Sequence, residues 1–288
     1  MKRSATPLLM LAPALTATGI LVFFPVLNTL WLSLHNVVLF RPKSQPFVGL
    51  ANYVEALHSQ AFWDSLGRSV VWVVGSVSLQ FLIGLGVALL LNRDFRMRGL
   101  VRAIIVVPWA LPSVIIGLVW TWMLDFNFGI LNQIGVAFGL LDEPVAWLAQ
   151  SGTAMAAVMA AIVWQGFPFF AITLLAGLQS IPHDLYEGAE IDGANAWYTF
   201  VYVTVPGLLP VMVTALLLRM IWVANSLDLI LVMTGGGPGT STQTLPLHAF
   251  LTAWSGGNYG SGAALSTLLT LILLSVITIY VVRGQVDG

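Results

Sequence analysis

Aromatic rings and neutral hydrogen-bonding groups occur together in three apolar stretches of the sequence. These read VPWALPS (residues 107–113), WQGFPFF (164–170) and RMIWVANSLD (219–228). Aromatic faces stack on the carbon-bound hydrogens of a sugar ring, and hydroxyl and amide groups hydrogen bond to its hydroxyl groups. This chemistry suits a neutral polyol better than an ion. The alternative is helix packing, in which rings face lipid or a neighbouring helix and polar groups bond between helices.

Arg219 is the residue of this set that is hardest to place in an apolar environment. An Arg at the centre of a membrane span costs about 2.5 to 3.5 kcal/mol on insertion scales, and less toward the end of the span. We therefore expect Arg219 to face a cavity or a carboxylate. Asp228 follows two to three turns later, which is too far for direct pairing unless the helix breaks between them.

Several other chemistries are excluded by residue type. The chain has no cysteine, and its four histidines have no metal-ligand spacing, so we expect each histidine to be structural. Neither of the two lysines, Lys2 and Lys43, follows a glycine, so the phosphate-binding loop GxxxxGK[ST] is absent. A process driven by ATP would need another chain to hydrolyse it. A formal net charge of −1 offers no reason to expect nucleic-acid binding.

The composition is that of a membrane protein. Apolar residues make up 58% of the chain and charged residues 8%, against about 25% charged residues in soluble domains. The apolar runs predict an all-α protein that crosses the membrane six times. The predicted spans are residues 7–34, 69–91, 103–124, 153–178, 201–224 and 261–282. The first run is longer than a secretory signal core, so we interpret it as a span, although cleavage as a leader is the alternative.

The distribution of Lys and Arg predicts that both termini are cytoplasmic. The connection at residues 92–102 contains Arg93, Arg96, Arg98 and Arg102, and Lys2, Arg3 and Arg283 fall on the same side. Arg41, Lys43 and Arg68 fall outside. This count places residues 181–200 in the cytoplasm, although that loop contains no basic residue. No internal repeat or linker divides residues 1–288, so we expect a single domain.

Two further connections carry predictions. Residues 35–68 form a polar outer loop with a possible short helix at 51–66. The later stretch MTGGGPGTSTQT (233–244) is rich in glycine and hydroxyl groups, which indicates a flexible outer segment.

An acidic stretch at residues 181–210 interrupts the apolar second half. It contains Asp184, Glu187, Glu190 and Asp192 without any Lys or Arg. Pro182 and the early acids favour a short helix over 183–191, and small residues among the acids would let another protein approach closely. We interpret the stretch as a docking loop. The predicted contact residues are Asp184, Leu185, Tyr186, Glu187, Ala189, Asp192 and Gly193. A metal site on these acids is a weaker alternative, because His183 is the one nearby imidazole.

The same stretch resembles the signature of permease subunits of binding-protein-dependent ABC importers. Glu187, Ala189, Gly193 and Pro206 stand at the signature spacing, and DLYEGAEIDGA is most similar to the sugar-importing, maltose and glycerol-phosphate type. Three positions depart from the pattern by small or apolar replacements: Gly188, Val203 and Val205. The resemblance extends from the first span to the sixth. It implies the type I ABC importer permease core, with a short cytoplasmic coupling helix.

The resemblance also implies a set of partners and a sugar path. Its sugar-contacting positions correspond to Gln165, Gly166, Phe169, Arg219, Trp222 and Ser226, and the residue chemistry adds Trp109 and Ser113. Gln165 and Arg219 stand where the maltose protein has smaller or apolar residues, which argues against maltose as the cargo. The implied partners are a second permease, a dimeric ATPase that binds ATP and Mg, and an extracytoplasmic sugar-binding protein. The second permease could be another gene product or a second copy of this chain.

Two other classes of function are less consistent with the sequence. A proton-coupled secondary sugar transporter needs intramembrane Asp, Glu or His, and the spans offer none beyond Asp228 at one end. A sodium-coupled transporter stays open, because backbone carbonyls can bind that ion. A membrane enzyme would need paired acids, an activated nucleophile or metal ligands near the bilayer, and only the acids of the docking loop cluster.

Overall fold

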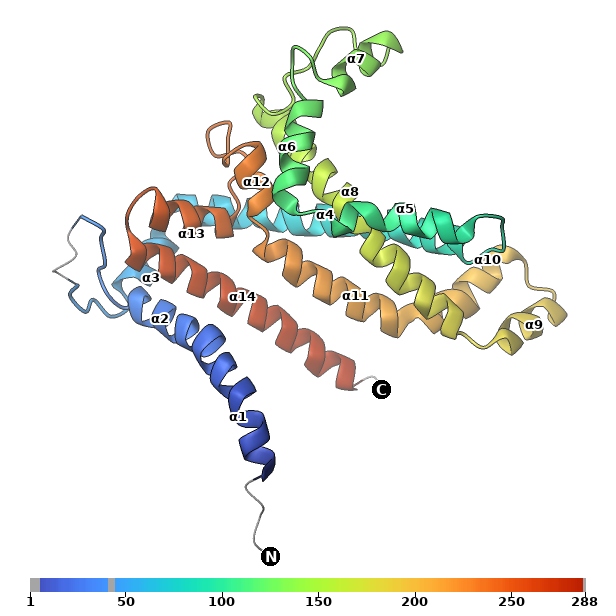
Figure 1. Cartoon of the computed structure of the whole chain (residues 1–288), viewed down its shortest axis with the longest axis horizontal. Coiled ribbons are helices and arrows are strands. Elements are labelled where there is room, and N and C mark those ends of the chain that lie inside the picture. Colours follow the sequence, from blue (N-terminus) through green and yellow to red (C-terminus); the bar gives the residue numbers. More distant parts are fainter. Residues whose placement is uncertain (1–5, 41–44, 287–288) are drawn as a thin grey trace, which may run out of the picture. The chain divides into compact units, whose positions relative to one another are not determined.

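The computed structural model describes residues 6–40 and 45–286, and helices dominate this part of the chain. Lys2, Arg3, Arg41 and Lys43, which entered the charge count, lie outside the described residues. The helices are α1 (Thr6–Thr18), η1 (Gly19–Phe23), α2 (Phe24–Ser33), α3 (Ala51–His58), α4 (Gln60–Leu91), α5 (Arg98–Ala110), α6 (Ser113–Met123), α7 (Ile130–Ala137), α8 (Ser151–Ser180), α9 (His183–Ile191), α10 (Ala196–Thr199), η2 (Phe200–Thr204), α11 (Val205–Asn225), α12 (Asp228–Met233), α13 (Leu245–Trp254) and α14 (Tyr259–Val286). Figure 1 shows their order along the chain. Over the described ranges, β-structure is limited to two isolated bridges, so the all-α prediction is confirmed.

The helices agree with the predicted spans. Five are long and apolar enough to cross a membrane: Met10–Ser33, Gln60–Leu91, Ser151–Ser180, Ala196–Asn225 and Tyr259–Tyr280. A sixth crossing results if α5 and α6 are taken as one span, although they are bent by 95°. The third predicted span therefore corresponds to two helices that meet at a bend rather than to one straight helix.

The break between α5 and α6 follows from Pro112. A proline has no backbone N–H and disfavours helical angles in the residue before it. Leu111 accordingly has extended backbone angles, φ −81° and ψ 141°, and α6 begins directly after the proline. Pro108 is tolerated inside α5. Of the two prolines that flank Trp109, Pro112 determines the bend.

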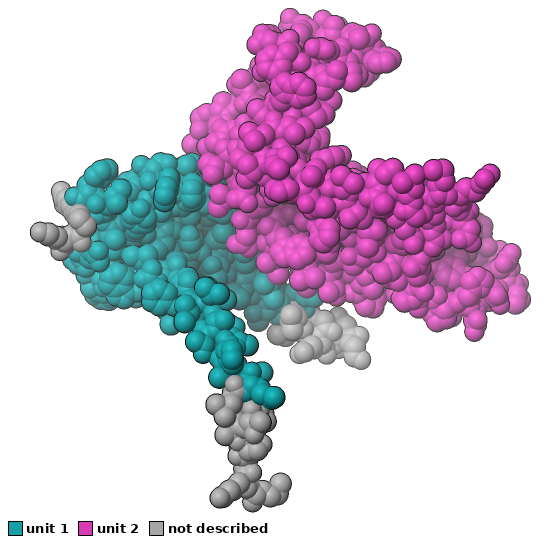
Figure 2. Space-filling model, in the orientation of Figure 1, with its two compact units in different colours: residues 1–66, 245–288 teal, residues 67–244 magenta. Residues whose placement is uncertain are grey.

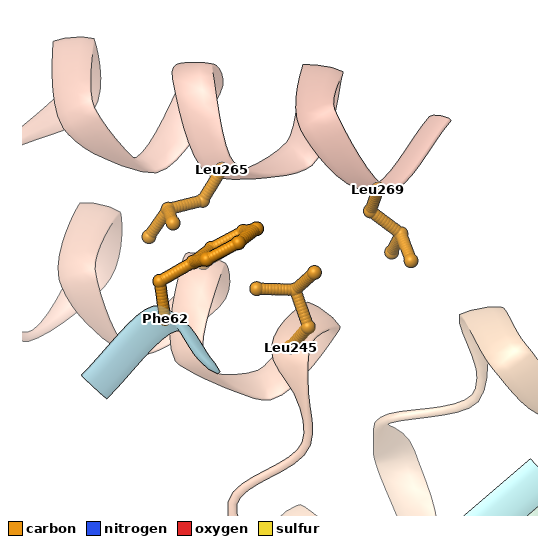
Figure 3. Close-up of a cluster of buried hydrophobic side chains, with 5 residues drawn as sticks. Phe62, Leu245, Leu265 and Leu269 are labelled. Carbon is orange, nitrogen blue, oxygen red and sulfur yellow. The ribbon is translucent and has the colours of Figure 1, made fainter. Parts of the chain in front are cut away.

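The chain packs as two compact units (Figure 2). One comprises residues 1–66 and 245–288, and the other residues 67–244. In the first unit, α14 packs against α2, α3 and α13, and a buried apolar cluster joins Phe62, Leu245, Leu265 and Leu269 (Figure 3). Because α4 contributes residues to both units, the division leaves the single-domain prediction untested.

The second unit is built around α8, which packs against α5 and α11. Glycines allow the closest approaches: a Cβ at Gly84 of α4 would overlap Phe170 of α8, and one at Gly177 would lie 2.8 Å from Leu208 of α11. Trp72 of α4 is fully buried and donates its indole N–H to the carbonyl of Val223 at 3.0 Å. Small residues at the closest contacts, and buried hydrogen bonds such as that of Trp72, therefore hold α4, α8 and α11 together, as is common in membrane helix packing.

Two predicted connections differ from the structure. The short helix expected over 51–66 divides at Ser59, whose extended backbone separates α3 from α4, so the second long helix begins at Gln60 instead of residue 69. The segment at 233–244 was predicted to be flexible, but its turns are held by hydrogen bonds. Thr242 is fully buried and its hydroxyl lies 2.7 Å from that of Thr234 and 2.9 Å from the carbonyl of Gly237. Glycine here permits positive φ angles, as at Gly236, rather than disorder.

Candidate functional site

Six of the eight predicted path residues line one cavity of about 410 Å³ in the second unit, which we call the polar cavity. Its walls come from the α5–α6 bend, the middle of α8 and the C-terminal end of α11. The lining residues are Trp109, Ser113, Ile162, Gln165, Arg219, Ile221, Trp222, Val223, Asn225, Ser226 and Asp228. Rings, hydroxyls, amides and one residue of each charge sign therefore share a single space.

Breaks in two helices supply much of the polarity of the cavity. At the α5–α6 bend the amide nitrogen of Gln165 lies 3.3 Å from the carbonyl of Leu111 and 3.4 Å from the hydroxyl of Ser113. On the other side α11 ends at Asn225, Ser226 is extended, and α12 begins at Asp228. Irregular backbone at membrane depth is tolerated where it lines a water-filled path or is buried in protein. The cavity lies at such breaks.

Because the helix breaks after Asn225, Asp228 lies on the same cavity as Arg219. Both line the polar cavity. The described residues nevertheless contain no Arg219 carboxylate ion pair within 4.0 Å, and the two ion pairs found there are Arg98–Asp94 and His183–Glu187. Arg219 therefore faces a cavity, as predicted, without a direct acidic partner.

Arg219 is instead bound by a residue that sequence reasoning missed. Its Nε–H donates to Oε1 of Gln80 at 2.6 Å, and Gln80 donates its own amide to the carbonyl of Ile162 at 3.1 Å. Gln80 is fully buried and Arg219 is 7% exposed. A signal was available in the sequence: Gln80 is a lone amide in the apolar run of the second span, and polar residues inside spans mark interhelical contacts or functional sites.

The two remaining predicted path residues lie outside the lining. Gly166 is next to the Arg219–Gln80 contact, where a Cβ would overlap the Nη2 atom of Arg219 and the amide of Gln80. The Phe169 ring packs edge-on against Trp222, with ring centroids 5.2 Å apart. Trp222 is 46% exposed, so Phe169 supports a ring that faces the cavity. Gly166 and Phe169 thus contact cavity residues rather than the cavity itself.

The predicted docking helix is present with the predicted bounds. α9 spans His183–Ile191, Pro182 precedes it, and Asp184 lies in its first turn, where a carboxylate favours the positive end of the helix dipole. Its end is a Schellman turn: the N–H of Gly193 bonds to the carbonyl of Glu190 at 3.0 Å, and the N–H of Ala194 to that of Ala189 at 2.9 Å. Gly193 has a φ of +75°, so glycine is required by backbone angle.

A second cavity, of about 620 Å³, lies beside this helix and is called the α9 cavity. Its lining includes five of the seven predicted docking residues: Asp184, Leu185, Ala189, Asp192 and Gly193. Gly188, Ala194, Tyr198, Thr199, Tyr202 and Val203 complete the lining. Ile191 is 86% exposed, and the exposed rings of Tyr198 and Tyr202 are stacked 5.8 Å apart. The site therefore combines acids with exposed apolar groups.

The other two predicted docking residues make contacts within the chain. The hydroxyl of Tyr186 lies 3.3 Å from that of Thr204 and ties α9 to η2. Oε1 of Glu187 lies 3.1 Å from Nδ1 of His183, one helical turn earlier. The Glu187 side chain is largely exposed. The described part of the chain contains no cluster of three His, Asp or Glu residues that could hold a metal ion. The acids of α9 are therefore spread along the helix rather than gathered.

The long apolar helices are those of a multi-pass membrane protein, and a family comparison identifies its class. Residues 80–285 match the model of the family described as binding-protein-dependent transport system inner membrane component, and the chain belongs to this family. It is similar to the trehalose/maltose transport system permease protein MalF of Thermococcus litoralis, with 42% identity over 96% of this chain and 92% of that protein. It is also similar to the sulfoquinovosyl glycerol transport system permease protein SmoG of Agrobacterium fabrum, with 34% identity over 94% of this chain and 88% of that protein.

Solved structures show the same fold at lower identity. One is a bacterial ABC transporter involved in the import of the acidic polysaccharide alginate. The match covers 99% of this chain and 96% of that chain, with a TM-score of 0.84 and 21% sequence identity. The methionine ABC transporter in an inward-facing conformation matches 78% of this chain and 98% of its own, with a TM-score of 0.56 and 20% identity. The type I importer core predicted from the signature is confirmed, and the chain is a multi-pass inner-membrane protein.

Proposed function

We propose that the chain is a permease subunit of an ATP-driven carbohydrate importer and forms half of the sugar path. The observation that carries this proposal is the polar cavity, in which Trp109 and Trp222 face the same space as Gln165, Ser113 and Arg219. Rings stack on a sugar, and the amide, hydroxyl and guanidinium groups can hydrogen bond to its oxygens. Relatives at 42% and 34% identity are named as trehalose/maltose and sulfoquinovosyl glycerol permeases, which supports the same substrate class.

The partners follow from the parts that this chain lacks. Without a phosphate-binding loop it needs a separate ATPase, which would bind ATP and Mg and dock at α9. Half a path needs a second permease chain, a different gene product in our proposal. An extracytoplasmic binding protein would deliver the sugar; one related fold was solved with an alginate pentasaccharide-bound periplasmic protein. Both termini and α9 would then be cytoplasmic, consistent with the distribution of Lys and Arg.

The mechanism would be alternating access of the polar cavity. Closure of the ATPase dimer would move α9, and the turn at residues 192–195 joins α9 to α10, η2 and the fifth span. Tyr186 joins α9 to Thr204 at the start of that span, which gives a displacement of the docking helix a direct route into α11. α11 carries Arg219 and Trp222, so the same rigid element links the docking site to the cavity.

The test is uptake by the purified complex in proteoliposomes, with trehalose, maltose and an acidic disaccharide as probes. We expect uptake of at least one sugar to require ATP, to stop when the ATPase subunit is inactivated, and to persist when ionophores collapse the proton and sodium gradients. Uptake that follows an ion gradient without ATP would instead support a secondary transporter. Within this assay, Trp222→Ala should reduce uptake or alter selectivity, whereas Trp122→Ala is the control because Trp122 is exposed outside both cavities.

A further inference from the structure

Gln80, the hydrogen-bond partner of Arg219, is not among the residues that line the polar cavity and is not part of the predicted sugar-contacting set. Gln80 is on α4, Ile162 and Gly166 are on α8, and Arg219 is on α11. Both functional ends of the Gln80 amide are used: the oxygen accepts from Arg219 at 2.6 Å and the nitrogen donates to the carbonyl of Ile162 at 3.1 Å. One fully buried amide therefore links three helices.

The contact leaves the charged end of Arg219 for the cavity. A guanidinium has five N–H donors in a planar fork, and Gln80 occupies the one on Nε. Among the described residues, the terminal Nη atoms of Arg219 are not buried atoms left without a hydrogen-bond partner. Arg219 also lines the polar cavity. Two adjacent terminal nitrogens are a geometry suited to two neighbouring oxygen acceptors of a ligand.

The guanidinium of Arg219 packs closely on Gly166 of α8. A side chain at this position would overlap both Nη2 of Arg219 and the amide of Gln80, so these groups pack directly over the glycine. The guanidinium is thus confined between the surface of α8 and the amide of Gln80. Without a carboxylate within 4.0 Å among the described residues, Gln80 is its principal fixed acceptor.

We propose that Gln80 is a positioning residue of the transport path, which holds the positive charge of Arg219 against the polar cavity so that its terminal N–H groups meet the oxygen atoms of the cargo. Gln80 itself does not touch the cargo. The neutral amide suits this task better than a carboxylate would, because it fixes the fork and leaves the charge available to the cavity. The role assigned to the cargo rests on the proposed function, whereas the placement of the charge does not.

The absence of cysteine from the chain allows a direct measurement of that charge. A single reporter, Ser226→Cys, places a thiol in the cavity lining. In the assembled transporter, its rates of modification by an anionic sulfonatoethyl and a cationic trimethylammonioethyl methanethiosulfonate are compared. We expect Arg219→Gln to lower the anionic-to-cationic rate ratio about tenfold, because one unit charge acts with opposite sign on the two reagents across a few Å.

The decisive variant is Gln80→Met, which keeps the length of the side chain and removes the acceptor. We expect it to lower the rate ratio at least about threefold, because the guanidinium is no longer held toward the cavity. Gln80→Leu also removes the acceptor without adding a charge, and it is measured if the Met variant does not assemble. Gln165→Leu is the matched control: Gln165 lines the cavity and its amide bonds to Leu111 and Ser113 rather than to Arg219, so the ratio should stay at the parent value.

The outcomes separate this proposal from the proposed function. An unchanged ratio in Gln80→Met, with a lowered ratio in Arg219→Gln, would show that Gln80 is a packing residue and overturn the proposal. An unchanged ratio in Arg219→Gln would overturn it as well, because the charge would not reach the cavity. The ratio is measured without ATP and without cargo, so a failure of ATP-driven sugar uptake would contradict the proposed function and leave this result intact.

Discussion

Single residues determine how closely the helices around the polar cavity can approach. Gly166 lies directly beneath Gln80 and Arg219, where even one added carbon would overlap their side chains. Phe169, one turn farther along α8, packs edge-on against Trp222. Each residue was predicted as a sugar contact, and in the structure each contacts a residue that lines the cavity. Their effect on transport would therefore be exerted through Arg219 and Trp222.

Gly166→Ala tests this view at the scale of one methyl group. The added Cβ must displace the buried Arg219 and Gln80 side chains, and overpacking of this kind typically costs about 1 to 3 kcal/mol. We expect a lower thermal midpoint of the purified complex and reduced uptake. Gly152→Ala, on the same helix with nothing within 4 Å of its Cβ, is the control and should leave the midpoint unchanged. Equal midpoints for both variants would argue against close packing over Gly166.

The signature residues lie on α9 and in the turn that follows it, beside the α9 cavity. α9 and its Schellman turn present five predicted docking residues on one cavity, and Tyr186 fastens the helix to η2. Two glycines of the signature region have different physical requirements. Gly193 has a positive φ and open space around its Cβ, whereas Gly188 is helical and also has open space. The same substitution should therefore have opposite effects at the two positions.

Gly193→Ala and Gly188→Ala form a matched pair for hydrogen exchange at the amides of α9. A left-handed backbone costs a non-glycine residue about 1 to 2 kcal/mol, so Gly193→Ala should raise exchange at the helix end roughly tenfold and reduce uptake. Replacing a mid-helix glycine by alanine stabilises by about 0.5 to 1 kcal/mol, so Gly188→Ala should slow exchange. Faster exchange in both variants would contradict this prediction. It would mean that an added methyl group destabilises α9 at either position, whatever the backbone angle.

At the scale of the whole molecule, the membrane crossings decide which cavity is reached from which side. Five helices are long enough to cross, and if the bent α5–α6 pair forms a sixth crossing, the loop with Leu140 would lie outside and α9 inside. The loop at α9 contains no basic residue, so this orientation rests on the number of crossings and on the arginines at residues 92–102.

Single cysteines on the cysteine-free chain test the orientation. Leu140→Cys and Ile191→Cys replace residues that are 78% and 86% exposed, so both thiols should be reactive. In right-side-out membrane vesicles, an impermeant maleimide should label Cys at position 140 only, and permeabilised vesicles should label both. External labelling at position 191 would reverse the assignment and remove α9 from the side where an ATPase could dock.

The sequence by itself determined the helical elements, including α9. Apolar runs must satisfy their backbone polar groups internally, which leaves helices as the solution, and the bounds of α9 follow from Pro182 and Gly193. Six of the eight predicted path residues line the polar cavity, and they could be selected because polar and aromatic side chains are conspicuous in apolar spans.

Only the tertiary structure decided what these residues contact. The pairing of Gln80 with Arg219 joins positions 139 residues apart, and no local propensity encodes such a partner. The 95° bend at Pro112, the ordered turns at 233–244 and the displacement of Gly166 and Phe169 from the lining also arise from helix packing. The physical reason is that local patterns specify which face of an element is apolar, whereas close packing of one helix on another selects which side chains meet.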